Sequence, residues 1–213
     1  MFEGPFAESI VRRAQDKSLV EIKTHNLRDW STDKYKSVDD KPYGGGPGMI
    51  MRIDIIDQAV ASLKSQASNL PAGRQVPKII LLDAGGEKFN QRLAHDLSRD
   101  GHLIIICGHY EGVDHRVHEH IADEVISIGD YVLSGGEIPA MVIVDSVVRL
   151  LPGAVGNKES LVEESFNEDS RFKIQDSIEY PQYTRPEEYK GWKVPEILLS
   201  GDHKKIKEWR KIV

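Results

Sequence analysis

Two glycine-rich stretches in the middle of the chain carry residue types suited to binding a small molecule. The first is Gly108-His-Tyr-Glu-Gly-Val-Asp114, and the second is Ile128-Gly-Asp-Tyr-Val-Leu-Ser-Gly-Gly-Glu137. The first follows the apolar run 104–106 and the second begins at the end of the run 125–128. Runs without polar alternation are typical of strands buried on both faces of a parallel sheet. Since ligands bind where such strands end, the two stretches predict a small-molecule site.

Charged residues that could act in catalysis lie further along the chain. Asp145 and Arg149 are four residues apart within a predicted helix. Their side chains can form a surface ion pair worth about 0.3–0.5 kcal/mol. Alternatively, the aspartate holds the arginine toward a developing negative charge. The spacing does not choose between these readings. Glu164, in a polar stretch, is by composition a solvated carboxylate.

Two further patterns invite a metal or phosphate site. The histidines at 109, 115, 118 and 120 lack the cysteine or carboxylate spacing of a structural metal site, which favours exposed histidines on a polar helix. Neither Gly44-Gly-Gly-Pro-Gly48 nor Leu133-Ser-Gly-Gly-Glu137 belongs to a nucleotide phosphate loop, because the required Gly-Lys-Ser/Thr ending is absent. The segment 44–48 is either a flexible turn or a backbone that passes close to a phosphate or sugar.

The elements that would position these residues follow from periodicity. Helices are predicted at 8–14, 53–63, 89–97, 137–150 and 203–212. Strands are predicted at 19–24, 78–82, 104–106 and 125–128, and Asp83-Ala-Gly-Gly86 is expected to end the second of them. Strands alternating with helices predict an α/β fold with a mainly parallel sheet. The stretch 157–177 has the composition of a linker, and 180–186 that of a rigid turn.

Composition restricts the class of protein. The 213 residues carry a net charge of −6, with 29% charged residues and a single cysteine, Cys107. There is thus no disulfide framework, and a reducing cytoplasm is expected. No apolar run approaches the ~20 residues of a membrane span, and the first residues show no signal-peptide pattern. Residues 189–213 hold seven Lys/Arg against three Asp/Glu, which indicates either a solvated helix face or an RNA-contacting appendage.

Taken together, the motifs resemble the bacterial tRNA (guanine-N1)-methyltransferase family, TrmD, of the SPOUT superfamily. Eight motifs carry the resemblance, in family order over nearly the whole chain. They are Pro42-Tyr-Gly-Gly-Gly-Pro-Gly-Met49, the stretches 108–114 and 128–137, Pro139-Ala-Met141, Leu151-Pro-Gly153, Glu164-Ser-Phe166, Tyr180-Pro-Gln-Tyr-Thr-Arg-Pro186 and Leu198-Leu-Ser-Gly201.

The resemblance implies an architecture and partners that the residues alone do not give. It implies a mainly parallel α/β domain with a C-terminal trefoil knot at residues 1–156, a flexible linker at 157–178 and a small helical, tRNA-contacting domain at 179–213. It also implies a cytoplasmic homodimer with a shared active site and S-adenosylmethionine as cofactor, and it leaves a role for Mg²⁺ open. Periodicity would have given an ordinary Rossmann-like sheet, because threaded connections are nearly absent from proteins.

The implied reaction is methylation of N1 of the guanine at tRNA position 37, just 3′ of the anticodon. By position, Glu164 matches the base that removes the N1 proton, and Arg149 matches the group that stabilises charge on O6. Tentative substrate contacts are Gly44, Gly45, Gly46, Glu179 and Arg185, and no residue is assigned to a metal. The implied cofactor pocket comprises Leu82, Gly108, Tyr110, Glu111, Gly112, Ile128, Gly129, Tyr131, Leu133, Gly135, Gly136 and Pro139.

The chain departs from the family pattern at several places. It begins after the usual first strand, ends before the usual basic terminus, and has a long segment at 167–177. Glu164 stands where many members have Asp, and Asp83-Ala-Gly-Gly86 replaces the common Ser-Pro-Gln-Gly. These departures leave one alternative, a catalytically impaired tRNA- or cofactor-binding fragment of the same family. An unrelated nucleotide-binding Rossmann-like enzyme is disfavoured, since no phosphate-binding fingerprint is present.

Overall fold

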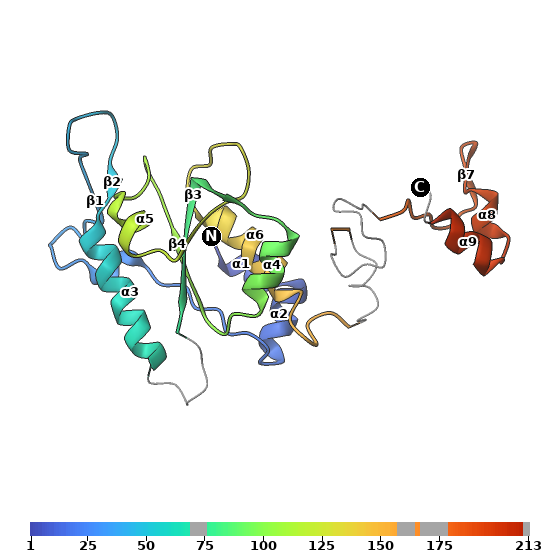
Figure 1. The fold of residues 1–213 in the computed structure, drawn as a ribbon, viewed down its shortest axis with the longest axis horizontal. Helices are drawn as coiled ribbons and strands as arrows, with labels where there is room; N and C mark the ends of the chain where they lie inside the picture. The colour runs from blue at the N-terminus through green and yellow to red at the C-terminus, as the bar shows by residue number, and fades with distance from the viewer. Residues whose placement is uncertain (69–75, 157–164, 167–178, 211–213) are drawn as a thin grey trace. The chain divides into compact units, whose positions relative to one another are not determined.

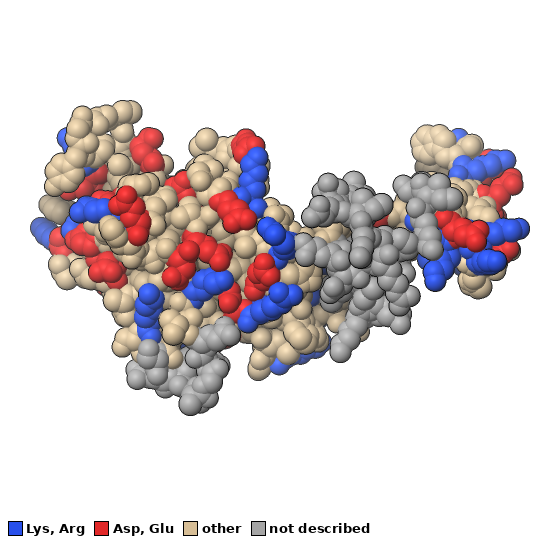
Figure 2. Space-filling model, viewed as in Figure 1, with Lys and Arg blue, Asp and Glu red and all other residues tan. Residues whose placement is uncertain are grey.

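The computed structural model describes residues 1–68, 76–156, 165–166 and 179–210 (Figure 1). The chain divides into two compact units, Met1–Lys158 and Glu159–Val213, and each is described by itself. Among the described residues, no helix is both long and apolar enough to cross a membrane. Acidic and basic side chains are interspersed on the face of the first unit that Figure 2 shows.

A three-stranded parallel sheet forms the centre of the first unit. Its strands are β3 (Lys78–Lys88), β4 (Leu103–Cys107) and β5 (Glu124–Ser127), in the order β4-β3-β5. The prediction of a mainly parallel α/β fold is therefore confirmed. A separate antiparallel pair joins β1 (Asp39–Asp40) to β2 (Ile50–Met51).

Helices cover both faces of this sheet (Figure 1). On one face Ile79 and Leu81 pack with α3 (Ile53–Ser68) and α5 (Arg116–His120). On the other face Ile80 and Leu82 pack with α4 (Gln91–Ser98) and α6 (Glu137–Val148). The four side chains are at most 5% exposed, as expected for a strand with no polar alternation.

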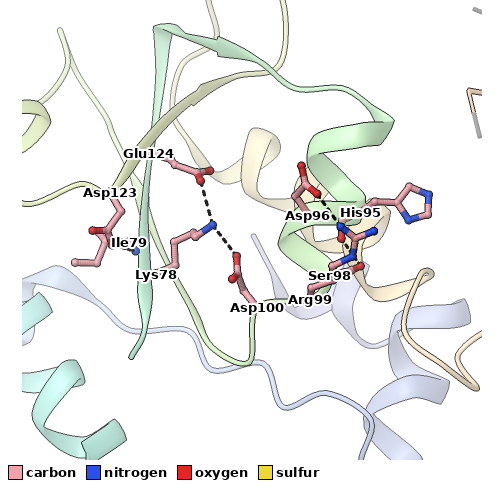
Figure 3. Close-up of polar contacts among 9 residues, drawn as sticks. All are labelled: Lys78, Ile79, His95, Asp96, Ser98, Arg99, Asp100, Asp123 and Glu124. Carbon is pink, nitrogen blue, oxygen red and sulfur yellow. Dashed lines mark hydrogen bonds and ion pairs between the residues drawn. The ribbon is translucent and has the colours of Figure 1, made fainter. Parts of the chain in front are cut away.

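Polar side chains tie the amino ends of the three strands together (Figure 3). Lys78 Nζ, at the start of β3, lies 2.8 Å from Asp100 Oδ2 and 3.1 Å from Glu124 Oε1. Asp123 Oδ2 accepts a hydrogen bond of 2.7 Å from the backbone N–H of Ile79. Because Asp100 precedes β4 and Glu124 begins β5, these contacts hold all three strands in place at this end.

Helices α1 (Glu3–Phe6) and α2 (Ser9–Asp16) precede the sheet, so the early helix is confirmed, but the strand predicted at 19–24 is wrong. That segment is extended without a neighbouring strand. Val20 and Ile22 pack into a third apolar cluster with α2 and α6, whereas Glu21 and Lys23 are exposed. The alternation that predicted a strand thus reflects one buried side and not pairing. A 3-10 turn, η1 (Leu27–Trp30), follows this segment and was not predicted.

The predicted end of the second strand at Asp83 is also wrong. Strand β3 continues to Lys88, but its register against β5 shifts between Leu82 and Glu87. Residues 83–86 therefore bulge out of the ladder before pairing resumes. The continuation depends on Gly86, where a Cβ atom would lie 2.6 Å from the backbone of Val125 and Ile126.

The second unit contains a short hairpin and two short helices. The hairpin pairs β6 (Glu188–Tyr189) with β7 (Trp192–Lys193), and the helices are α8 (Glu196–Leu199) and α9 (His203–Trp209). The two-residue turn has φ of 54° and 84°, as primed turns require. The basic helix predicted at 203–212 is confirmed as far as its described residues go, and the hairpin was not predicted.

Candidate functional site

One cavity lies at the carboxyl ends of the three parallel strands. It is formed by residues 82–84 at the start of the bulge in β3, the loop after β4, and the end of β5 with the loop that leads to α6. Its lining residues are Leu82, Asp83, Ala84, Gly108, His109, Tyr110, Glu111, Gly112, Val113, Ile126, Ser127, Ile128, Gly129, Tyr131, Val132, Leu133, Ser134, Gly135, Gly136 and Pro139. All twelve residues expected around a cofactor are in this set, so the structure brings the predicted pocket together.

Backbone hydrogen bonds fix the loops around the cavity to one another. His109 forms an antiparallel bridge with Gly135, and the N–H of Gly136 donates to the carbonyl of Gly108 over 2.8 Å. The N–H of Glu111 donates to the carbonyl of Met49 over 3.1 Å. This bond connects the loop after β4 to the residue that follows the glycine-rich segment 44–48. The wall of the cavity is therefore preformed.

Gly136 permits the close approach of two of these loops. A Cβ atom at this position would lie 2.7 Å from Cys107 Cα and 2.9 Å from the backbone nitrogen of Gly108. Real side chains do not tolerate such contacts with backbone. Only glycine therefore allows the start of α6 to pack against the end of β4.

The chemistry of the lining separates into apolar and acidic parts. Ile128, Leu133 and Pro139 offer an apolar surface, and backbone groups of the glycine-rich loops offer donors and acceptors. The charged lining residues are Asp83 and Glu111, and no Lys or Arg of the described part of the chain lines the cavity. Such a site fits a ligand with a flat apolar ring, polar edges and positive charge. S-adenosylmethionine, with its adenine, ribose, sulfonium and ammonium groups, has these properties.

Cys107 lies at the end of β4 beside the cavity but is not suited to nucleophilic chemistry. Burial, with a smaller contribution from the nearby charge of Glu137, raises the pKa of its thiol to about 12. A thiol with such a pKa remains protonated near neutral pH. Cys107 is therefore not an activated nucleophile beside this cavity.

The residues expected to perform the reaction do not line this cavity. Arg149 follows the last residue of α6, ten residues beyond Pro139, which at 1.5 Å per residue is about 15 Å along the helix axis. Its backbone N–H donates to the carbonyl of Asp145, as in a regular helix. Glu164 lies outside the described residues. Within one copy of the first unit, Arg149 and the cavity are thus far apart.

The tentative substrate residues lie in two places. Gly44, Gly45 and Gly46 are exposed with positive φ, in a loop whose Gly48 approaches the Glu111 side chain too closely to allow a Cβ atom. Glu179 and Arg185 are exposed in the second unit. The N–H of Glu179 donates to Ser165 Oγ over 2.9 Å.

Several lining residues were not predicted, above all Asp83 and His109. His109 lies inside a motif that had been singled out, so its place next to Gly108 was a usable signal. Asp83 was expected to end a strand and to begin one of three loops that converge on the ligand, but it was not named as a site residue. In the described part of the chain, no group of three or more His, Cys, Asp or Glu side chains could hold a metal ion. The ring of His118 instead stacks on that of His115, with centroids 5.0 Å apart.

The chain matches the model of one protein family over residues 1–213, described as tRNA (Guanine-1)-methyltransferase TrmD. A tRNA (guanine-N(1)-)-methyltransferase of Dictyoglomus turgidum is 56% identical over 99% of the chain and 79% of that protein. The enzyme of Bacillus subtilis is 49% identical over 99% and 81%. The crystal structure of tRNA (m1G37) methyltransferase from Aquifex aeolicus superposes with a TM-score of 0.77, at 38% identity over 99% and 82% of the two chains.

A preformed cavity at the carboxyl ends of parallel strands, together with these relatives, defines the class: the chain is a tRNA-modifying methyltransferase. Within that class it belongs to the tRNA (guanine-1)-methyltransferase family, TrmD. The resemblance given by the motifs is confirmed, and the binding-only alternative is not favoured.

Proposed function

We propose that this chain transfers the methyl group of S-adenosylmethionine to N1 of guanine 37 in tRNA. The observation that carries the proposal is the convergence of all twelve expected cofactor residues on one cavity, in a chain of this family. When bound, S-adenosylmethionine supplies an activated methyl group. The apolar surface of Ile128, Leu133 and Pro139 would hold the adenine face, and backbone groups of the glycine-rich loops would hold its polar edge.

Two residues outside the cavity prepare the guanine in this proposal. N1 carries a proton at neutral pH, and the Glu164 carboxylate removes it, which makes the nitrogen nucleophilic. The Arg149 guanidinium stabilises the negative charge that develops on O6. Since Arg149 lies about 15 Å along α6 from the cavity wall, it acts on a cavity of a second copy. A homodimer with shared active sites meets this requirement.

The remaining parts of the chain have roles in the same scheme. The carboxyl-terminal part of the domain at 1–156 forms a trefoil knot, the linker is 157–178, and the small domain at 179–213 contacts the tRNA. The exposed residues Gly44, Gly45, Gly46, Glu179 and Arg185 contact the substrate. The excess of basic residues after Tyr189 favours an RNA partner, and the reaction takes place in the cytoplasm.

A methyl-transfer assay with matched tRNAs tests the proposal. Methyl incorporation is expected with guanine at position 37 and not with adenine there, with a chelator arm to measure any need for Mg²⁺. Incorporation into neither tRNA would overturn the proposal and support a binding-only protein.

Two substitutions test the assigned roles. Glu164→Gln is expected to abolish turnover with little change in S-adenosylmethionine affinity. Arg149→Ala should slow turnover by a barrier increase of about 3 kcal/mol. Circular dichroism checks that each variant is folded. Loss of cofactor affinity together with turnover would assign Glu164 to the pocket instead of to proton removal.

A further inference from the structure

We propose that Asp83 is a cofactor-binding residue of this cavity, that its carboxylate faces a positively charged group of S-adenosylmethionine, and that His118 positions it. The proposal rests on the proposed function, because it names a contact within the same pocket. Neither residue belongs to the expected cofactor set. Asp83 falls where the common family pattern has Ser.

The position of Asp83 follows from the bulge in β3. Leu82 is the last residue paired before the register shift, and Asp83 is the first residue released from the ladder. The side chain is 32% exposed and lines the cavity. Its Oδ1 accepts a hydrogen bond of 2.8 Å from the N–H of Gly85, within the bulge. One oxygen of this carboxylate is thus held within the bulge, at the wall of the cavity.

The second contact of this carboxylate comes from α5. His118 Nε2 lies 3.4 Å from Asp83 Oδ2, and the His118 side chain is only 20% exposed. Its Nδ1 atom is buried and has no hydrogen-bond partner among the described residues. A proton on Nδ1 would therefore be buried without an acceptor, which is costly. The ring is best accommodated with its proton on Nε2, directed at Asp83, and the stacked His115 limits its rotation.

Charge selects the ligand group that Asp83 faces. The charged lining residues are two carboxylates, and no Lys or Arg of the lining neutralises them. S-adenosylmethionine presents two cationic groups, its sulfonium and its ammonium. An oriented carboxylate in a partly buried cavity attracts such a cation more strongly than it would in bulk water. Asp83 therefore raises affinity for charged ligands and contributes little to the neutral adenosine part.

Three ligands separate these contributions in a calorimetric titration of the full chain. S-adenosylmethionine carries both cationic groups, S-adenosylhomocysteine only the ammonium, and 5′-methylthioadenosine neither. Asp83→Asn is expected to lower the affinity for S-adenosylmethionine about tenfold or more and to leave the affinity for 5′-methylthioadenosine unchanged. If the variant loses the same factor of affinity for S-adenosylhomocysteine, the group that Asp83 faces is the ammonium. If the affinity for S-adenosylhomocysteine is unchanged, the group that Asp83 faces is the sulfonium.

The controls distinguish this proposal from the proposed function and from unfolding. Failure of the unmodified protein to bind S-adenosylmethionine would contradict the proposed function itself. Glu87→Gln, at an exposed position of the same strand outside the cavity, should bind all three ligands normally. The assignment of Asp83 is overturned if Asp83→Asn binds S-adenosylmethionine normally. It is also overturned if the affinity for 5′-methylthioadenosine falls by the same factor as that for S-adenosylmethionine.

The positioning role of His118 has its own test. His118→Leu should lower the affinity for S-adenosylmethionine but not that for 5′-methylthioadenosine. His118→Gln, which retains an N–H donor, should keep most of the affinity for S-adenosylmethionine. The double variant with Asp83→Asn should bind no more weakly than Asp83→Asn alone. His120→Leu, at a side chain 69% exposed, is the matched control. The positioning role of His118 would be refuted if His118→Leu had an unchanged affinity for S-adenosylmethionine, or if its affinity for 5′-methylthioadenosine fell equally.

Discussion

The two ends of the central sheet use the same three strands in opposite ways. At the amino end, Lys78 is shared between Asp100 and Glu124, and Asp123 accepts from the backbone of Ile79. These polar groups find their partners within the protein. At the carboxyl end the lining formed by the described residues holds two carboxylates and no Lys or Arg, together with loops rich in glycine. The comparison teaches that one end stabilises the fold, whereas the other leaves its charge and backbone available to a ligand.

The largest effect should come from closing the carboxyl end. Gly136→Ala places a Cβ atom against the backbone of Cys107 and Gly108, so the start of α6 must move away from β4. We expect S-adenosylmethionine to bind about thirtyfold or more weakly, for a strain of about 2 kcal/mol. Calorimetric titration measures this change. Gly156→Ala, where a Cβ atom meets nothing within 4 Å, is the control, and equal affinity of both variants would contradict the account.

A change at the amino end should act on stability alone. Lys78→Met keeps the aliphatic length but leaves Asp100 and Glu124 without their shared cation. We expect the free energy of unfolding to fall by about 1–2 kcal/mol, between the values for exposed and buried pairs, since the Lys78 side chain is 30% exposed. Urea denaturation followed by circular dichroism measures it. A weakened affinity for S-adenosylmethionine would show that the two ends are not separate.

The smallest effect is a pH dependence of the same contact. Hydrogen bonding to Asp100, and then to Glu124, raises the pKa of Lys78. A raised pKa means that the stabilisation is complete below the ordinary lysine value of about 10.4 and is lost as pH rises through the folded-state pKa. The stability difference between the unmodified chain and Lys78→Met should therefore shrink only in strongly alkaline solution. Exposed Lys41→Met is the control, and a difference that shrinks near neutral pH would argue against this cause.

The sequence predicted the strands more securely than it predicted their ends. Continuous apolar runs such as 104–106 indicated burial on both faces, and the two sides of β3 are indeed covered. The glycine-rich loops were placed at strand ends for the same reason. Their convergence on one cavity came from resemblance, since periodicity carries no information on which loops meet.

What the sequence could not show depends on partners distant along the chain. Strand β3 resumes after the bulge because Gly86 approaches the backbone of Val125, and no local pattern contains that contact. One partner of Lys78, Glu124, lies 46 residues away along the chain, and no sequence motif contains both residues. The hairpin at Lys190–Gly191 did leave a signal, a two-residue turn with a glycine between aromatic residues, which was not used.

The bulge at 83–86 has a consequence for how this protein can change over time. Two of its residues, Asp83 and Ala84, contribute side chains to the cavity wall, yet both lie between the paired parts of β3 and outside the apolar clusters on both faces. A substitution at Asp83 or Ala84, unlike one at Gly86, alters what the wall attracts without placing a Cβ atom against the backbone of β5. Ligand preference can thus drift at these positions while the scaffold remains constant.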